Sequence, residues 1–95
     1  MSPEVLESNY TSKADMWSLG VLLYTLVSGY LPFQGASHAE VFRKIKAVEF
    51  HFNHVEFSTV SSECKDLISK LLNGNPKKRL SGQQALQHPW FKLNP

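Results

Sequence analysis

The sequence is short of several features that mark particular classes of protein. Cys64 is its only cysteine, so no disulfide can form within the chain, and a reducing compartment, the cytoplasm or the nucleus, is expected. The formal net charge of +2 is too small to indicate nucleic-acid binding. We find no secretion signal, lipidation motif, internal repeat or low-complexity tract. A single globular domain is therefore expected for the 95 residues.

Residues that could carry chemistry are also scarce. Neither of the glycine-rich patterns that bind phosphate, G-x-G-x-x-G and G-x-x-x-x-G-K-[ST], occurs. His51 and His54 have no cysteine nearby, and zinc needs three or four converging donors, so no metal site is expected. Cys64 lies at an apolar position without a base beside it in the sequence, which predicts a buried structural thiol.

The dominant feature that is present is the apolar stretch from Asp15 to Gly29. A helix made from it has no face suited to water and should be buried. Asp15 can cap its first N–H groups, Gly29 can adopt the left-handed turn that ends it, and Pro32 prevents its continuation. A membrane span needs about 20 apolar residues, and this run is shorter. We therefore predict a buried central helix and no membrane span.

Other helices must surround this one, and the sequence contains residues that typically begin a helix at four further places. Ser2 and Pro3 suit a short helical turn, whereas serines are the expected caps of the remaining three helices. The residues between 49 and 60 alternate aromatic and polar side chains without a helical period, so we predict an irregular segment held by its aromatics. The fold class is thus all-α, with about five helices around the central helix from Asp15 to Gly29. The expected surrounding segments are 2–8, 38–48 (capped by Ser37), 62–72 (capped by Ser61) and 82–88 (capped by Ser81 with Gln84).

The order of the motifs resembles the C-terminal part of the large lobe of a eukaryotic protein kinase domain. The matching residues are Ser2-Pro3-Glu4 for the motif that ends the activation segment, Asp15-x-Trp17-Ser18-x-Gly20, Leu31-Pro32-Phe33 and Asn75-Pro76-x-x-Arg79. Within the family, Phe50-x-Phe52 and Ala85-Leu86-x-His88-Pro89-Trp90-Phe91 are similar to the calcium/calmodulin-regulated group, above all the calcium-dependent protein kinases. The resemblance covers residues 1–95, from the end of the activation segment to the final helix of the large lobe.

The resemblance implies structural roles for four residues. Glu4 would form an ion pair with Arg79, which joins the activation segment to the helical base; two unrelated exposed charges are the alternative. Asp15 would accept hydrogen bonds from the backbone of the catalytic loop, and Trp17 would pack under the activation segment. The central helix would then be the platform that holds the catalytic groups in place.

The resemblance also implies two surfaces for protein partners. Tyr30 and Phe33 would line the lower edge of the substrate groove, although plain core packing is an equal alternative for either. The helix over 38–48 would dock a substrate or regulatory protein through Val41, Phe42 and Ile45.

The catalytic parts of the family are absent from this sequence. The N-terminal lobe, with its glycine-rich loop and lysine, and the H-R-D and D-F-G motifs precede this segment in the family, and none occurs here. The parent protein would be a serine/threonine kinase that uses ATP and Mg²⁺, whereas these 95 residues should bind neither and should be inactive alone. The alternative is a non-catalytic helical binding module, or a pseudokinase-like remnant, that presents Val41, Phe42 and Ile45.

Overall fold

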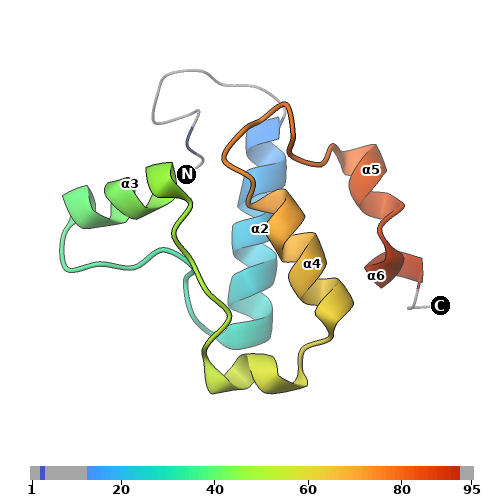
Figure 1. Ribbon diagram of the computed structural model, residues 1–95, viewed down its shortest axis with the longest axis horizontal. Helices are drawn as coiled ribbons and strands as arrows, with labels where there is room; N and C mark the ends of the chain where they lie inside the picture. The colour runs from blue at the N-terminus through green and yellow to red at the C-terminus, as the bar shows by residue number, and fades with distance from the viewer. Residues whose placement is uncertain (1–2, 4–12, 93–95) are drawn as a thin grey trace.

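The structure is a computed structural model that describes residue 3 and residues 13–92. It contains helices α2 (Lys13–Ser28), α3 (His38–Ala47), α4 (Ser62–Leu71), α5 (Gly82–Leu86) and α6 (Pro89–Lys92), with a 3-10 helix, η1 (Val55–Thr59). No strand occurs in the described part of the chain. Figure 1 shows α2 and α4 side by side at the centre, α3 on one side and α5 and α6 on the other. The all-α prediction is confirmed. Apart from Pro3, which is helical and buried, the predicted turn over 2–8 lies outside the described residues.

Helix α2 is buried along one face rather than all round. Ala14, Trp17, Tyr24 and Ser28 recur at helical spacing and are buried, and Gly20 between them lets α4 approach closely. A Cβ atom at Gly20 would lie 2.8 Å from the Cβ of Leu71. The opposite face carries three exposed leucines and has no cover within the described residues: Leu19, Leu22 and Leu26 are 40%, 53% and 72% exposed.

The two ends of α2 were predicted with different success. The helix begins at Lys13, so Asp15 lies inside the first turn and is not the cap that we predicted. A carboxylate in the first turn still stabilises the helix, because it faces the positive end of the helix dipole. Gly29 ends the helix as predicted, with a left-handed φ of 82° and an N–H that donates to the Thr25 carbonyl at 2.8 Å.

Helix α3 begins as predicted and ends in an unexpected way. The Ser37 hydroxyl accepts from the Glu40 N–H, so the predicted cap is confirmed. The helix ends at Ala47, where Val48 adopts a left-handed conformation with φ 52°. Branched residues rarely adopt this conformation, so no sequence signal predicts it.

The segment after α3 is held by its aromatics, as the sequence predicted, and the residue that they pack against is Tyr24, which the sequence did not indicate. The rings of Phe50, Phe52 and Phe57 lie 6.3, 6.0 and 4.8 Å from the Tyr24 ring, centroid to centroid. The Tyr24 hydroxyl donates to the His51 carbonyl at 2.7 Å, and burial raises the pKa of this tyrosine. The segment is irregular up to His54, but Val55–Thr59 then forms η1, which the sequence did not predict.

The C-terminal helices also follow their local signals. Ser61 caps α4, and Ser81 forms the predicted capping box with Gln84 at the start of α5. Pro89 lies just after the helix predicted over 82–88 and opens α6, a helix that the sequence did not predict, since proline suits the first helical position. Cys64 is buried in α4, and burial raises the pKa of its thiol.

His88 joins α4 to the C-terminal end of the fold. Its Nδ1 accepts from the Trp90 N–H at 3.1 Å, which places the ring proton on Nε2, where it donates to the Asp66 carboxylate at 2.7 Å. This hydrogen bond is the main cause, with Lys70 second, of a pKa of Asp66 below its ordinary value of 3.8.

Replacing Asp66 with asparagine should reduce the loss of stability in acid. Because folding lowers the pKa of Asp66, the ionised carboxylate stabilises the fold above the unfolded pKa, and this contribution disappears as pH falls through the lowered value. The effect should be small, because half of the Asp66 side chain is exposed. Chemical denaturation at neutral and at acid pH, followed by circular dichroism, measures the loss of unfolding free energy between the two, with Glu49→Gln at an exposed ion pair as the control. An equal loss for Asp66→Asn and wild type would contradict the prediction.

Candidate functional site

The first turn of α2 meets the loop over 73–79 around a buried arginine. Arg79 is 1% exposed, and its guanidinium carbon lies 5.0 Å from the centroid of the Trp17 ring. The Phe33 ring also stacks on Trp17, with a distance of 5.5 Å between the ring centroids. The Arg79 Nε donates to the Asn73 carbonyl at 2.9 Å, and Nη1 donates to the Lys13 carbonyl at 2.8 Å. Ring stacking and hydrogen bonds therefore hold the guanidinium on two sides.

Lys13 is a part of this junction that sequence reasoning missed. Its ammonium donates to the carbonyls of Pro76 and Arg79, at 3.0 and 2.6 Å. These partners are more than 60 residues away in the sequence, so no local pattern indicates them. In the same loop, the Asn75 side chain accepts from the Lys77 N–H at 3.0 Å, which fixes the start of the turn that leads to Arg79.

The structure bears on only part of the predicted ion pair. Glu4 lies outside the described residues, so its pairing with Arg79 stays a prediction. Arg79 itself is buried, which excludes the alternative of an exposed charge at this position. Asp15 is exposed in the first turn of α2, and its support of a catalytic loop is likewise still a prediction. The Trp17 indole N–H is buried and has no hydrogen-bond partner among the described residues.

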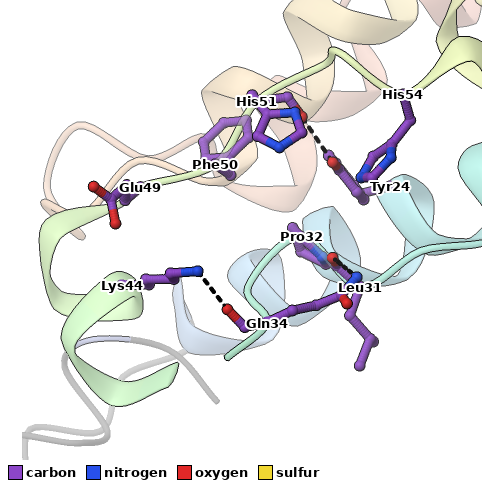
Figure 2. Close-up of a pocket in the computed structure, with 9 residues that line it drawn as sticks. All are labelled: Tyr24, Leu31, Pro32, Gln34, Lys44, Glu49, Phe50, His51 and His54. Atoms are coloured by element: carbon purple, nitrogen blue, oxygen red, sulfur yellow. Dashed lines mark hydrogen bonds between the residues drawn. The ribbon is translucent and has the colours of Figure 1, made fainter. Parts of the chain in front are cut away.

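A cavity of about 480 Å³ opens between the loop after α2, helix α3 and the aromatic segment (Figure 2). Two of its polar side chains already have partners within the chain: Lys44 donates to the Gln34 carbonyl at 2.6 Å, and the Gln34 amide donates to the Leu31 carbonyl at 2.9 Å. The residues that line it are Tyr24, Leu31, Pro32, Gln34, Lys44, Glu49, Phe50, His51 and His54.

The two residues predicted for the substrate-groove edge lie in different environments. Tyr30 is on the surface, where its ring stacks on His54 at 4.0 Å and its hydroxyl donates to Glu56 at 3.3 Å. Phe33 is buried against Trp17, so of the two alternatives the structure places it in the core. No group of three or more potential metal ligands occurs among the described residues.

The predicted docking residues are also divided. Phe42 is 41% exposed, Val41 is half-buried, and Ile45 is 6% exposed and belongs to the core. Phe42 and Val41 border a second cavity of about 440 Å³ between α3 and the loop over 31–35. Leu31 and Gln34 line both cavities, which therefore adjoin. Ile45 is thus removed from the surface that a partner can touch.

A third cavity, of about 220 Å³, is entirely apolar. It lies over the exposed leucines of α2 and reaches Leu67 and Leu71 of α4 and Trp90 of α6. No helix of the described residues has the length and apolar character that crossing a membrane requires.

Comparison with known proteins places these features in one family. The family model of the protein kinase domain matches residues 1–91. The chain belongs to the protein kinase family. The chain is 43% identical over 91 residues to the serine/threonine-protein kinase PEPKR2 of Arabidopsis thaliana, and the match covers 96% of this chain and 19% of the relative. It is 41% identical over 92 residues to calcium-dependent protein kinase 5 of Plasmodium falciparum, covering 97% and 16%.

The fold matches that of a solved kinase. The twitchin kinase region from C. elegans superposes with a TM-score of 0.90 at 42% identity, over 99% of this chain and 17% of the other. The resemblance to kinases of the calcium-dependent group and the all-α fold of a large-lobe segment are therefore confirmed. The chain spans less than a fifth of the length of these relatives. Kinases of this family use ATP with Mg²⁺ and act on proteins.

Proposed function

We propose that this chain supplies the scaffold and part of the substrate platform of a serine/threonine protein kinase. The observation that carries the proposal is the match of residues 1–91 to the kinase domain, in relatives that are whole kinases. The parent protein would transfer the γ-phosphoryl group of ATP to serine or threonine hydroxyls of proteins, in the cytoplasm or the nucleus.

In this proposal α2 is the platform of the large lobe. Phosphoryl transfer depends on the positions of ATP, Mg²⁺ and the hydroxyl, so the lobe must hold the reacting groups rigidly. Arg79, stacked on Trp17, would pair with Glu4 and fix the end of the activation segment. The groups that hold ATP and Mg²⁺ belong to motifs that this sequence does not contain, so the 95 residues alone should bind neither and should be inactive.

The exposed apolar face of α2 supports a place within a larger domain. Leu19, Leu22 and Leu26 line the third cavity with apolar residues of α4 and α6. Apolar patches of this kind are rarely left open on monomeric proteins, because water contact with them is unfavourable. A further element of the kinase domain would cover them.

The test is to express the protein encoded by the complete native transcript and to assay phosphoryl transfer from labelled ATP to a mixture of Ser/Thr peptides. We expect transfer by that product when it carries H-R-D and D-F-G motifs, and none by residues 1–95 alone. A complete product without these motifs, or one that has them and transfers nothing, contradicts the proposal and favours the non-catalytic binding module.

We also propose that the side of α3 that carries Phe42 binds a protein substrate or a regulatory protein of the parent kinase. The two adjoining cavities on either side of Leu31 and the exposed ring of Phe42 support this surface. Binding energy concentrates at aromatic side chains that become fully covered.

Replacing Phe42 with aspartate should weaken the binding of a protein substrate of the complete kinase by at least about tenfold, because the charge takes the place of an apolar anchor. Titration calorimetry with the complete kinase measures the change. Val55→Asp is the control, since Val55 is also exposed but lies on η1. Ile45→Asp is unsuitable, because the buried charge would unfold the helix. Equal affinities for Phe42→Asp and Val55→Asp would contradict a docking role for α3.

A further inference from the structure

Lys13, at the start of α2, and Arg79, in the loop over 73–79, each bind the main chain of the other through their basic side chains. The Arg79 guanidinium donates to the Lys13 carbonyl, and the Lys13 ammonium donates to the Arg79 carbonyl. We infer that Lys13 is a positioning residue: by bridging the carbonyls of Pro76 and Arg79, it sets the direction in which the Arg79 guanidinium points. The inference rests on the proposed kinase function and goes beyond the predicted pair of Glu4 with Arg79.

The geometry makes Lys13 suited to this task. Its ammonium lies 3.0 Å from the Pro76 oxygen and 2.6 Å from the Arg79 oxygen, so it spans the turn from its first residue to its last. The turn is also closed from within, because the N–H groups of Lys78 and Arg79 both donate to the Asn75 carbonyl at 3.0 Å. A turn fixed in this way holds the backbone of Arg79 in place, and from there the side chain reaches the Trp17 ring, with the guanidinium carbon 5.0 Å from the ring centroid.

Electrostatics indicates that the bridge is specific rather than incidental. Two cations at one junction repel each other, so the arrangement persists only where each charge gains strong hydrogen bonds. Hydrogen bonds from a charged donor to carbonyl oxygens are stronger than neutral ones, and an ammonium carries three such donors. Lys13 is half-buried and Arg79 is buried, which limits the screening of these bonds by water.

The functional consequence follows from the position of Arg79. A guanidinium that is rotated away from Trp17 presents its donors in a different direction and no longer holds the segment that it pairs with. Displacements of about 1 Å in residues that position a substrate reduce catalysis by up to about a hundredfold. Loss of the Lys13 bridge should therefore affect the use of the protein substrate, while the binding of ATP, which depends on other parts of a kinase, should not change.

The test compares Lys13→Met, Lys13→Arg and Lys70→Met in the complete kinase. Lys70 is the control, because its ammonium also makes a short polar contact, with the Asp66 carboxylate at 2.9 Å, but on α4 and away from the surface proposed for protein substrates. For each variant, steady-state kinetics gives KM for peptide and for ATP, with kcat per titrated active site. Hydrogen exchange followed by mass spectrometry reports the amides of Lys78 and Arg79. Should Lys13→Met fail to accumulate, Lys13→Gln, which keeps an uncharged donor, takes its place.

We expect Lys13→Met to raise the peptide KM roughly tenfold, to leave the ATP KM unchanged and to speed exchange at Lys78 and Arg79. Lys13→Arg should restore most of both properties, and Lys70→Met should resemble wild type. A Lys13→Met enzyme that changes no more than Lys70→Met overturns the inference, as does a Lys13→Arg enzyme that behaves like Lys13→Met. If the complete protein transfers no phosphoryl group, the proposed function fails, and hydrogen exchange at Lys78 and Arg79 still tests the bridge.

Discussion

Replacing Gly20 with valine should separate α2 from α4 and lower the free energy of unfolding by about 3 kcal/mol or more. A Cβ atom at this position would lie 2.8 Å from the Leu71 Cβ, closer than Cβ atoms approach in real structures, and 3.0 Å from the Leu72 Cδ2, which is also a tight contact. Both leucines are fully buried, so neither can move aside cheaply. The extra methyl groups of valine enlarge the overlap.

Gly20→Ala refines this prediction, because two effects oppose each other. Alanine favours a helix by about 1 kcal/mol over glycine, whereas the overlap with Leu71 costs about 1–3 kcal/mol. We expect a net loss of stability smaller than that of valine. Thermal unfolding of the complete protein measures both variants, with Gly82→Ala as the control, since the nearest atom there, the Met16 sulfur, is 3.9 Å away. Equal melting temperatures for Gly20→Ala and Gly82→Ala would show that the contact between α2 and α4 tolerates a side chain.

Replacing Arg79 with methionine should lower the free energy of unfolding by about 3–5 kcal/mol. The change removes the charge stacked on Trp17 and leaves the carbonyls of Asn73 and Lys13 without their donor. Lysine should not rescue the loss, because one ammonium cannot stack on a ring and reach both carbonyls. Chemical denaturation of the complete protein measures the change in its large-lobe transition.

Arg43 provides the matched control for Arg79. Its guanidinium pairs with Glu49 at 3.3 Å, and both side chains are more than half exposed, so Arg43→Met should cost less than about 1 kcal/mol. If Arg79→Met were as mild as Arg43→Met, the buried guanidinium would contribute little to the fold. The proposed role of Arg79 as an anchor of the activation segment would then lose its structural basis.

The sequence predicted the parts of the fold that depend on neighbouring residues. Ser37, Ser61 and Ser81 cap their helices as expected, because a cap is a contact over three residues. Gly29 likewise ends α2 where only glycine is unstrained. The family resemblance placed Trp17 and Arg79 each next to the activation segment, but only the structure shows that the two side chains contact each other.

The features that were missed depend on distant parts of the chain. Helix α2 begins at Lys13, two residues before Asp15, the predicted cap. The Lys13 side chain is held by the Arg79 carbonyl, which is 66 residues away in the sequence, so no local pattern indicates this start. The exposure of Phe42 and the burial of Ile45 follow from how α3 lies on the fold, since both residues occupy one apolar stripe in the sequence. The left-handed backbone conformation of Val48 could not be predicted for the same reason, because the Val48 side chain packs against core residues that come from distant parts of the chain.

The uncovered leucines of α2 have a consequence for the order of events during synthesis. A chain leaves the ribosome from its N-terminus, and folding units form in that order. An element that precedes α2 in a longer chain is therefore available as soon as Leu19, Leu22 and Leu26 emerge, and it can cover them before α4 and α6 are made. A chain that is translated without that element exposes an apolar surface as soon as α2 forms, and chaperones and proteases would bind it there.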